Sequence, residues 1–252
     1  MSKKIDIEIK DYLTKLRLKT MLRQYTFLGE QAQAESLSYD EYLLSLLDAE
    51  YNARKVRRIE RSLRESQLPI DKDFSSFDLN RIPQKVKQQM KTLQRGDFTK
   101  NNENILVFGN PGSGKTHLIC ALGKKLINQD KRVYFSTCAL LLQDLLIAKK
   151  ELRLSNFINK LNKHDAIIID DIGYVQQEKE EMEVLFTLLA ERYEQGSVMI
   201  TSNLPFSKWE NIFKDPMMTA AAIDRIVHHS IILELNVESY RMKTAKGRKK
   251  EG

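Results

Sequence analysis

The chain has 252 residues, of which 42% are hydrophobic and 30% charged, a balance typical of globular proteins with one large domain or a large and a small one. No apolar run approaches the ~18 residues that span a bilayer, and the first residues lack the apolar centre of a signal peptide, so we expect a cytoplasmic protein. Two cysteines and four histidines exclude disulfide frameworks and familiar zinc sites, while a net charge of +7 is compatible with a polyanionic partner.

The beginning of the chain is predicted to be helical. Apolar residues recur at near-helical spacing from Leu13 to Tyr25. A second helix is expected after Ser38, because Ser38 and Glu41 have the spacing of a capping box. The apolar faces of these helices need a surface to pack against.

The second helix becomes strongly basic toward its end. Residues 54–64 carry six basic side chains, and Pro69 then breaks the helical pattern. This basic segment is either a DNA contact or a charged linker. We predict a helical domain over residues 1–68 that makes partner or inter-subunit contacts, followed by a linker over 69–103.

Five short apolar runs follow, separated by longer amphipathic segments. Four of them are apolar almost throughout, as expected of strands buried on both faces of a sheet. The alternation predicts an α/β fold with a five-stranded parallel sheet over residues 104–240, followed by a basic tail over 241–252. The expected strands are Ile105–Phe108, Val133–Ser136, Ala166–Ile169, Val198–Thr201 and Ile231–Leu235.

The first strand leads into a phosphate-binding loop of the form G-x-x-x-x-G-K-[ST], and a helix is expected directly after it. Glycines let backbone N–H groups turn toward phosphates, and the helix N-terminus adds positive potential. Lys115 is expected to reach the outer phosphates of ATP and the Thr116 hydroxyl to bind Mg²⁺. The predicted nucleotide-binding residues are Gly109, Asn110, Pro111, Gly112, Ser113, Gly114, Lys115, Thr116 and His117.

The third strand ends in two carboxylates. Asp170 is predicted to join the magnesium shell, and Asp171 to orient or deprotonate the attacking water. An acidic turn at a strand end is the alternative, which the phosphate loop about fifty residues upstream disfavours.

Two later positions are candidates for catalysis. Asn203 ends the fourth strand, where an amide can hold the attacking water, although it can equally start the turn before Pro205. Arg225 lies at the end of a helix expected to start with Asp215 as N-cap, and it can reach a neighbouring subunit's ATP, although a surface salt bridge explains it as well.

The order of these motifs resembles the AAA+ ATPases of the bacterial initiator and helicase-loader branch, and within it the IstB-type helper ATPases of insertion-sequence transposition. The resemblance covers nearly the whole chain, and its later motifs are more specific than the phosphate loop. It rests on residues 109–118, Asp170–Tyr174, Glu191–Glu194, Thr201–Phe206, Trp209, Asp224–Arg225, His228–His229 and Glu238–Arg241.

The resemblance implies an ATP-dependent, bacterial DNA-binding protein that oligomerises on duplex DNA, with ATP sites at subunit interfaces. Such proteins bend the DNA, associate with the nucleoid when bound, and recruit and activate a transposase. It also implies ATP hydrolysis, with Asn203 at the sensor position and Arg225 as the arginine that acts in trans. Many relatives have Glu where this chain has Asp171, which suggests slow hydrolysis; Arg241 is a candidate second sensor.

A helical insertion is expected over residues 139–163, between the second and third strands. The resemblance implies that it contacts DNA in the channel of the assembly. The candidate phosphate contacts are Lys149, Lys150, Arg153, Lys160 and Lys163, and a solvated helix face is the alternative.

Three rival functions share the core. A helicase loader would prefer single strands, but the insertion offers only Phe157 for base stacking. A P-loop kinase of small metabolites would need an arginine-rich lid, which no segment between the later strands supplies. The third rival is a scaffold that binds ATP but scarcely hydrolyses it, which Asp171 leaves open.

The residues that contact the adenine of ATP are also open. Phe74, Phe77 and Ile82 either pack on adenine or belong to the core.

Overall fold

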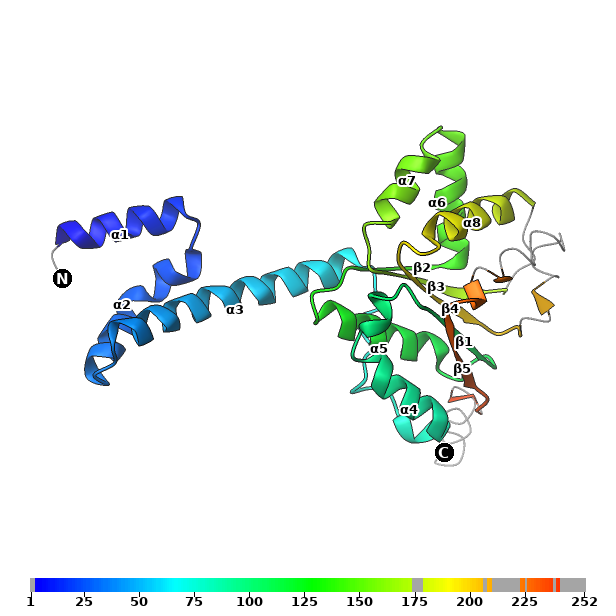
Figure 1. The fold of residues 1–252 in the computed structure, drawn as a ribbon, viewed down its shortest axis with the longest axis horizontal. Coiled ribbons are helices and arrows are strands. Elements are labelled where there is room, and N and C mark those ends of the chain that lie inside the picture. Colours follow the sequence, from blue (N-terminus) through cyan, green and yellow to red (C-terminus); the bar gives the residue numbers. More distant parts are fainter. Residues whose placement is uncertain are drawn as a thin grey trace, which may run out of the picture. The chain divides into compact units, whose positions relative to one another are not determined.

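A computed structural model describes residues 3–173, 179–205, 208–209, 223–224, 226–237 and 239–240 (Figure 1). The chain divides into two compact units, Met1–Arg61 and Ser62–Gly252. Several predicted features lie outside the described residues: Arg225, Arg241, the helix expected from Asp215 and the basic tail. Within the described parts, no helix combines the length and apolarity needed to cross a bilayer.

The first unit is helical, as the sequence indicated. It contains α1 (Lys3–Lys15), α2 (Lys19–Ala34) and most of α3 (Tyr39–Glu65). Its small core includes Met21, Tyr25 and Leu46, with partly buried side chains packed around them. The predicted capping box of α3 is confirmed: the Ser38 amide donates to Glu41 Oε2 at 2.8 Å, and the Glu41 amide donates to Ser38 Oγ at 3.3 Å.

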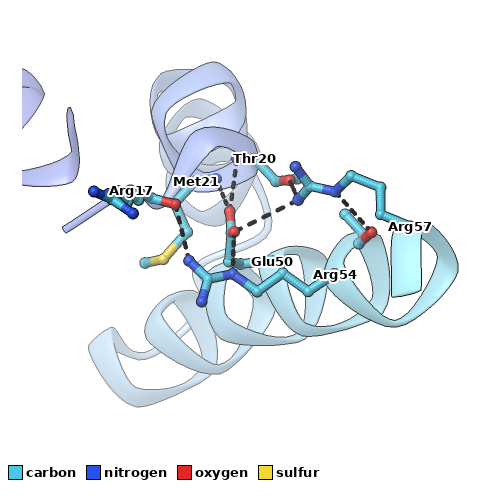
Figure 2. Close-up of polar contacts among 7 residues, drawn as sticks. Arg17, Thr20, Met21, Glu50, Arg54 and Arg57 are labelled. Atoms are coloured by element: carbon cyan, nitrogen blue, oxygen red, sulfur yellow. Dashed lines mark hydrogen bonds and ion pairs between the residues drawn. The ribbon is translucent and has the colours of Figure 1, made fainter. Parts of the chain in front are cut away.

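A buried carboxylate on α3 joins this helix to the start of α2 (Figure 2). Glu50 is only 4% exposed, and its Oε2 accepts hydrogen bonds from the backbone amides of Thr20 (2.6 Å) and Met21 (3.2 Å). Its Oε1 pairs with Arg54 Nε at 2.7 Å and lies 3.7 Å from the Arg57 guanidinium. Glu50 therefore caps the first turn of α2, which has no cap of its own at Leu18.

The second unit is built on a parallel sheet with the strand order β2-β3-β4-β1-β5. Figure 1 shows α4 and α5 on one side of the sheet and α6, α7 and α8 on the other. The strands are β1 (Asn104–Gly109), β2 (Val133–Thr137), β3 (Ala166–Ile172), β4 (Ser197–Ser202) and β5 (Ser230–Leu235). The α-helices are α4 (Gln84–Leu93), α5 (Lys115–Ile127), α6 (Cys138–Lys150), α7 (Leu154–Leu161) and α8 (Lys179–Arg192), and two 3₁₀ turns span Leu79–Arg81 and Asp97–Thr99.

The strands are apolar because helices cover both faces of the sheet. Ile105, Ile168 and Met199, on three different strands, are completely buried. All five predicted strands are present, each extended by one to three residues, so the predicted fold class is confirmed. Parallel strands end at the same edge, and the order of this sheet brings the ends of β1, β3 and β4 together.

Two residues that contribute to the resemblance lie in the core. Arg192, only 1% exposed, donates from its guanidinium to the backbone carbonyls of Leu161, His164 and Ser197, and burial lowers its pKa to about 10. Trp209 is completely buried and donates from Nε1 to the Leu204 carbonyl at 3.2 Å. These two buried side chains therefore stabilise the core of the second unit.

Candidate nucleotide site

The loop after β1 has the conformation that its glycines permit. Gly112 (φ +78°) and Gly114 (φ +98°) adopt positive φ values, which side chains disfavour. A Cβ atom at Gly112 would collide with the Ser239 side chain, and one at Gly114 would lie 2.9 Å from the Phe77 ring. Glycine is therefore required twice in this loop, for backbone conformation and for space.

Lys115 opens α5 and turns back over the loop. Its side-chain Nζ donates to the carbonyls of Gly109 (2.8 Å) and Asn110 (3.1 Å), which are neutral partners. Burial lowers the pKa of Lys115, and the negative charges of Asp171 and Asp170 partly offset this effect. The ammonium group therefore gains a strong electrostatic partner if phosphate oxygens enter the loop.

Asp170, at the end of β3, faces Thr116 at the start of α5. Its Oδ1 accepts hydrogen bonds from the Thr116 hydroxyl at 2.9 Å and the Thr201 hydroxyl at 2.6 Å. Burial raises the pKa of this carboxyl, and the two hydroxyl donors offset only part of the rise. No ion pair to Asp170 is present within the described residues. A buried carboxylate beside a hydroxyl is a donor set that suits a hard cation such as Mg²⁺.

Asp171 occupies an unusual backbone position. The pairing of β3 with β4 shifts register between Ile169 and Ile172, and Asp171 between them has a φ of +62°. Its amide donates to Thr201 Oγ1 at 2.8 Å, and its side chain is exposed. Irregularities of this kind re-aim side chains at functional sites, and this one directs Asp171 into the pocket.

These residues line one pocket with a volume of about 390 Å³. It brings together the loop from Pro111 to His117, both aspartates and Asn203, although three different strands supply them. Buried within the loop, Ser113 Oγ has no hydrogen-bond partner among the described residues. An orphaned donor in a glycine-lined loop fits a phosphate group.

The segment before β1 forms another wall of the pocket. Phe77 and Ile82 line it, whereas Phe74 is not among the lining residues. The ring Nε2 of His117 lies 2.8 Å from the Asp73 carbonyl oxygen, so the helix after the loop is tied to this segment. Asp73 is itself fixed by hydrogen bonds from Ser75 and Ser76, which lower its pKa to about 2.

Tyr240, the last described residue, forms a further wall of the pocket. The Tyr240 amide donates to the Gly112 carbonyl at 3.0 Å, and the Arg81 guanidinium lies 4.8 Å from the centre of the Tyr240 ring. Tyr240 and Arg81 both line the pocket. The guanidinium lies over the ring, so a cation–π contact joins these two side chains of the pocket wall.

The sequence reasoning missed Thr201 as a site residue. Its hydroxyl donates to Asp170 and accepts from the Asp171 amide, so one buried side chain orders both carboxylates. The available signal was its place, a polar residue directly after the apolar run Val198–Ile200. Arg81 carried no such signal, because its place at the pocket depends on how the linker folds back.

The five predicted DNA-contact residues lie away from this pocket. All five are exposed on α6, on α7 or in the turns that follow these helices. Lys149 Nζ lies 3.3 Å from Glu183, and Arg153 pairs with Glu151. None of the five is among the residues that line the nucleotide pocket.

The sheet order, the phosphate loop after β1 and the acidic pair near the end of β3 define a AAA+ P-loop ATP-binding protein. Comparison with known proteins narrows this class. The chain belongs to the family of IstB-like ATP binding proteins, which it matches over residues 11–248. It is therefore an ATP-binding protein of the insertion-sequence type.

Individual relatives agree with this assignment. An insertion-sequence ATP-binding protein of Sinorhizobium fredii is 43% identical over 92% of this chain and 78% of its own. The insertion sequence IS21 ATP-binding protein of Pseudomonas aeruginosa is 36% identical over 94% of this chain and 89% of its own.

Solved structures share the fold. The DnaC helicase loader superposes with a TM-score of 0.57 at 16% identity, covering 67% of this chain and 98% of its own. AMPPCP-bound DnaA from Aquifex aeolicus gives a TM-score of 0.58 at 18% identity, covering 74% and 57%. At these identities the likeness supports the fold alone.

Proposed function

We propose that this protein hydrolyses ATP with Mg²⁺, assembles on duplex DNA in its ATP state and recruits a transposase. The observation that carries the ATPase proposal is the cluster of Thr116, Asp170 and Thr201 beside the phosphate loop. The connection to transposition is supported by the family and by relatives whose names associate them with insertion sequences.

In this proposal each pocket residue has a task. The loop amides and Lys115 would bind the phosphates, and Thr116 and Asp170 would hold Mg²⁺, which when bound would neutralise charge on the phosphate oxygens. Asp171 accepts a proton from the attacking water while Asn203 orients it. Water adds to the γ-phosphorus, the bond to the bridging oxygen breaks, and ADP and phosphate leave.

Duplex DNA is supported as a partner by charge. The chain carries seven more basic than acidic residues, and the predicted contacts on α6 and α7 are exposed. Assembly would bring Arg225 of one subunit to the ATP of the next, as the resemblance implies. ATP would then act as the switch between assembled and released states.

The experiment that tests this proposal measures particle mass and DNA binding in the same samples. Matched single-stranded and duplex DNA are each mixed with the protein and either ATP or ADP. We expect large particles on duplex with ATP only, and Lys115→Ala should abolish them because it removes a phosphate contact. Preference for single strands would indicate a helicase loader, and a monomer without DNA affinity would indicate a metabolite kinase.

A further inference from the structure

The turn between α6 and α7 presents an exposed leucine in a constrained backbone position. Leu152 is 94% exposed and has a φ of +55°. Its amide donates to the Lys149 carbonyl at 3.1 Å, and the next amide, of Arg153, donates to the Ala148 carbonyl at 2.8 Å. This pair of bonds is a Schellman motif with Leu152 at the position where glycine is preferred.

Leucine is out of place at this position on steric and solvation grounds. A non-glycine residue in the left-handed region costs roughly 1–2 kcal/mol, and an exposed leucine recovers nothing by burial. Among the described residues, eight non-glycine residues have positive φ, and Leu152 is the single apolar one. The others are Arg17, Ser36, Gln67, Asn102, Asp130, Asp171 and Glu194.

Packing does not explain the leucine either. Leu154 and Phe157, close by in α7, pack against the large core of this unit, whereas Leu152 is not part of that cluster. Glycine or asparagine would form the same turn with less strain. Neither the geometry of the turn nor the core of this unit accounts for leucine at this position.

The neighbours of Leu152 indicate what kind of partner it meets. Residues 149–153 carry three basic side chains and one acidic side chain. The ion pairs of Lys149 with Glu183 and of Arg153 with Glu151 join side chains that are all at least 41% exposed, so phosphates can replace these carboxylates at little cost. A leucine between exposed cations suits a duplex, whose charged backbone flanks stacked apolar bases.

We propose that Leu152 is a wedge that inserts between stacked base pairs of duplex DNA, while Lys149, Lys150 and Arg153 hold the adjacent phosphates. This inference rests on the proposed duplex binding and adds the way in which the DNA is bent. Partial unstacking by an apolar side chain kinks the duplex, and the bend brings more phosphates to the protein surface.

The test compares the wild-type protein with Leu152→Asn, full length and with ATP. Asparagine tolerates the left-handed conformation, so the turn is kept while the apolar wedge is lost. Ile70→Asn is the matched control, because Ile70 is also an exposed aliphatic side chain (92%) but lies outside the α6–α7 pair. Permanganate reactivity of thymines reports unstacking, and energy transfer between the duplex ends reports bending.

We expect protein-bound duplex to show hyperreactive thymines and shortened end-to-end distance with the wild type and with Ile70→Asn. Leu152→Asn should lose the hyperreactivity and most of the bend, and bind about tenfold more weakly with an unchanged salt slope, since phosphate contacts set that slope. Lys150→Ala should instead reduce the slope.

The outcomes separate the wedge from the function on which it rests. If the wild type fails to bind duplex DNA, both proposals are wrong. If it binds without unstacking, or if Leu152→Asn unstacks the DNA as the wild type does, the wedge is wrong and duplex binding stands. If Leu152→Asn prevents self-association in the absence of DNA, the leucine is a protein contact and the wedge is rejected.

Discussion

Each unit of the protein contains a buried carboxylate, and the surroundings of the two shift their pKa values in opposite directions. Glu50 in the first unit and Asp170 in the second are both 4% exposed. Burial alone would raise the pKa of Glu50, but the hydrogen bond from Arg54 and those from the amides of Thr20 and Met21 outweigh it and lower the pKa. Asp170 has two neutral hydroxyl donors, and burial keeps its pKa raised.

The difference separates a structural carboxylate from one suited to a ligand. Glu50 has its cation and its donors within the same unit, so its charge is compensated when the chain folds. Asp170 forms no ion pair among the described residues, and the charge of Lys72 and the two hydroxyl donors offset only part of the effect of burial. A buried carboxylate without an ion pair, beside a phosphate loop, supports the proposed Mg²⁺ site.

The largest effect is expected from Asp170→Asn. Removing the carboxylate removes several kcal/mol of metal-ion stabilisation, which corresponds to at least about a hundredfold in hydrolysis rate. Without nucleotide the variant should nevertheless melt at a higher temperature than the wild type, because burial outweighs the partners of Asp170 and its charge destabilises the fold. Phosphate release and calorimetry measure the two quantities.

The contrast between Asp170 and Glu50 is contradicted if Asp170→Asn melts at a lower temperature than the wild type without nucleotide. Asp170 would then stabilise the fold, as Glu50 does. Adding Mg²⁺ and ATP supplies the control within the same experiment. Saturation at about 100 times Kd should stabilise the wild type by about 2.7 kcal/mol, and the variant should gain far less from Mg²⁺.

A smaller effect is expected from Thr201→Val, which keeps the shape but removes the hydroxyl that orders both aspartates. Losing such a supporting partner typically costs about 10–100-fold in activity or metal affinity. The Mg²⁺ concentration for half-maximal hydrolysis should rise, since Asp170 loses a donor that orients it. Thr201→Ser should restore both, and a Mg²⁺ dependence unchanged in Thr201→Val would show that Thr201 only fills space.

The sequence was sufficient for the parts of the site that follow from strand order. The pocket residues Pro111 to Thr116, Asp170 and Asn203 all follow or end buried apolar runs, and parallel strands bring such ends together. The five strands could be predicted because helices cover both faces and leave little room for polar residues.

The remaining parts of the site depend on tertiary contacts that have no local signal. Arg81 reaches the pocket because the segment before β1 folds back against the loop, where His117 holds it. Thr201 has its role because a register shift beside it turns Asp171 toward the pocket. The structural role of Arg192 was hidden too, since an arginine near a helix end suggests an exposed side chain.

A third prediction concerns Glu50→Gln in the first unit. The neutral amide weakens the pairing with Arg54 and the caps on Thr20 and Met21, so we expect a loss of about 2 kcal/mol in the free energy of unfolding. Hydrogen exchange at the amides of Thr20 and Met21 should accelerate. Glu30→Gln is the matched control, an exposed carboxylate on α2 whose loss should change neither quantity.

The smallest effect is the pH dependence of these two variants, and it tests the sign of each pKa shift. The lowered pKa of Glu50 stabilises the fold above its ordinary value of 4.5, and this stabilisation is lost as pH falls through the folded-state pKa. The raised pKa of Asp170 means that its charge destabilises the nucleotide-free fold at neutral pH. This destabilisation decreases as pH falls through the folded-state pKa of Asp170 and is gone below its ordinary pKa of 3.8. Denaturant titrations between neutral pH and pH 3 should therefore show the stability of Glu50→Gln approaching that of the wild type from below and that of Asp170→Asn from above. If both variants approach from the same side, the two buried carboxylates are alike and the assignment of Asp170 as the metal-binding one fails.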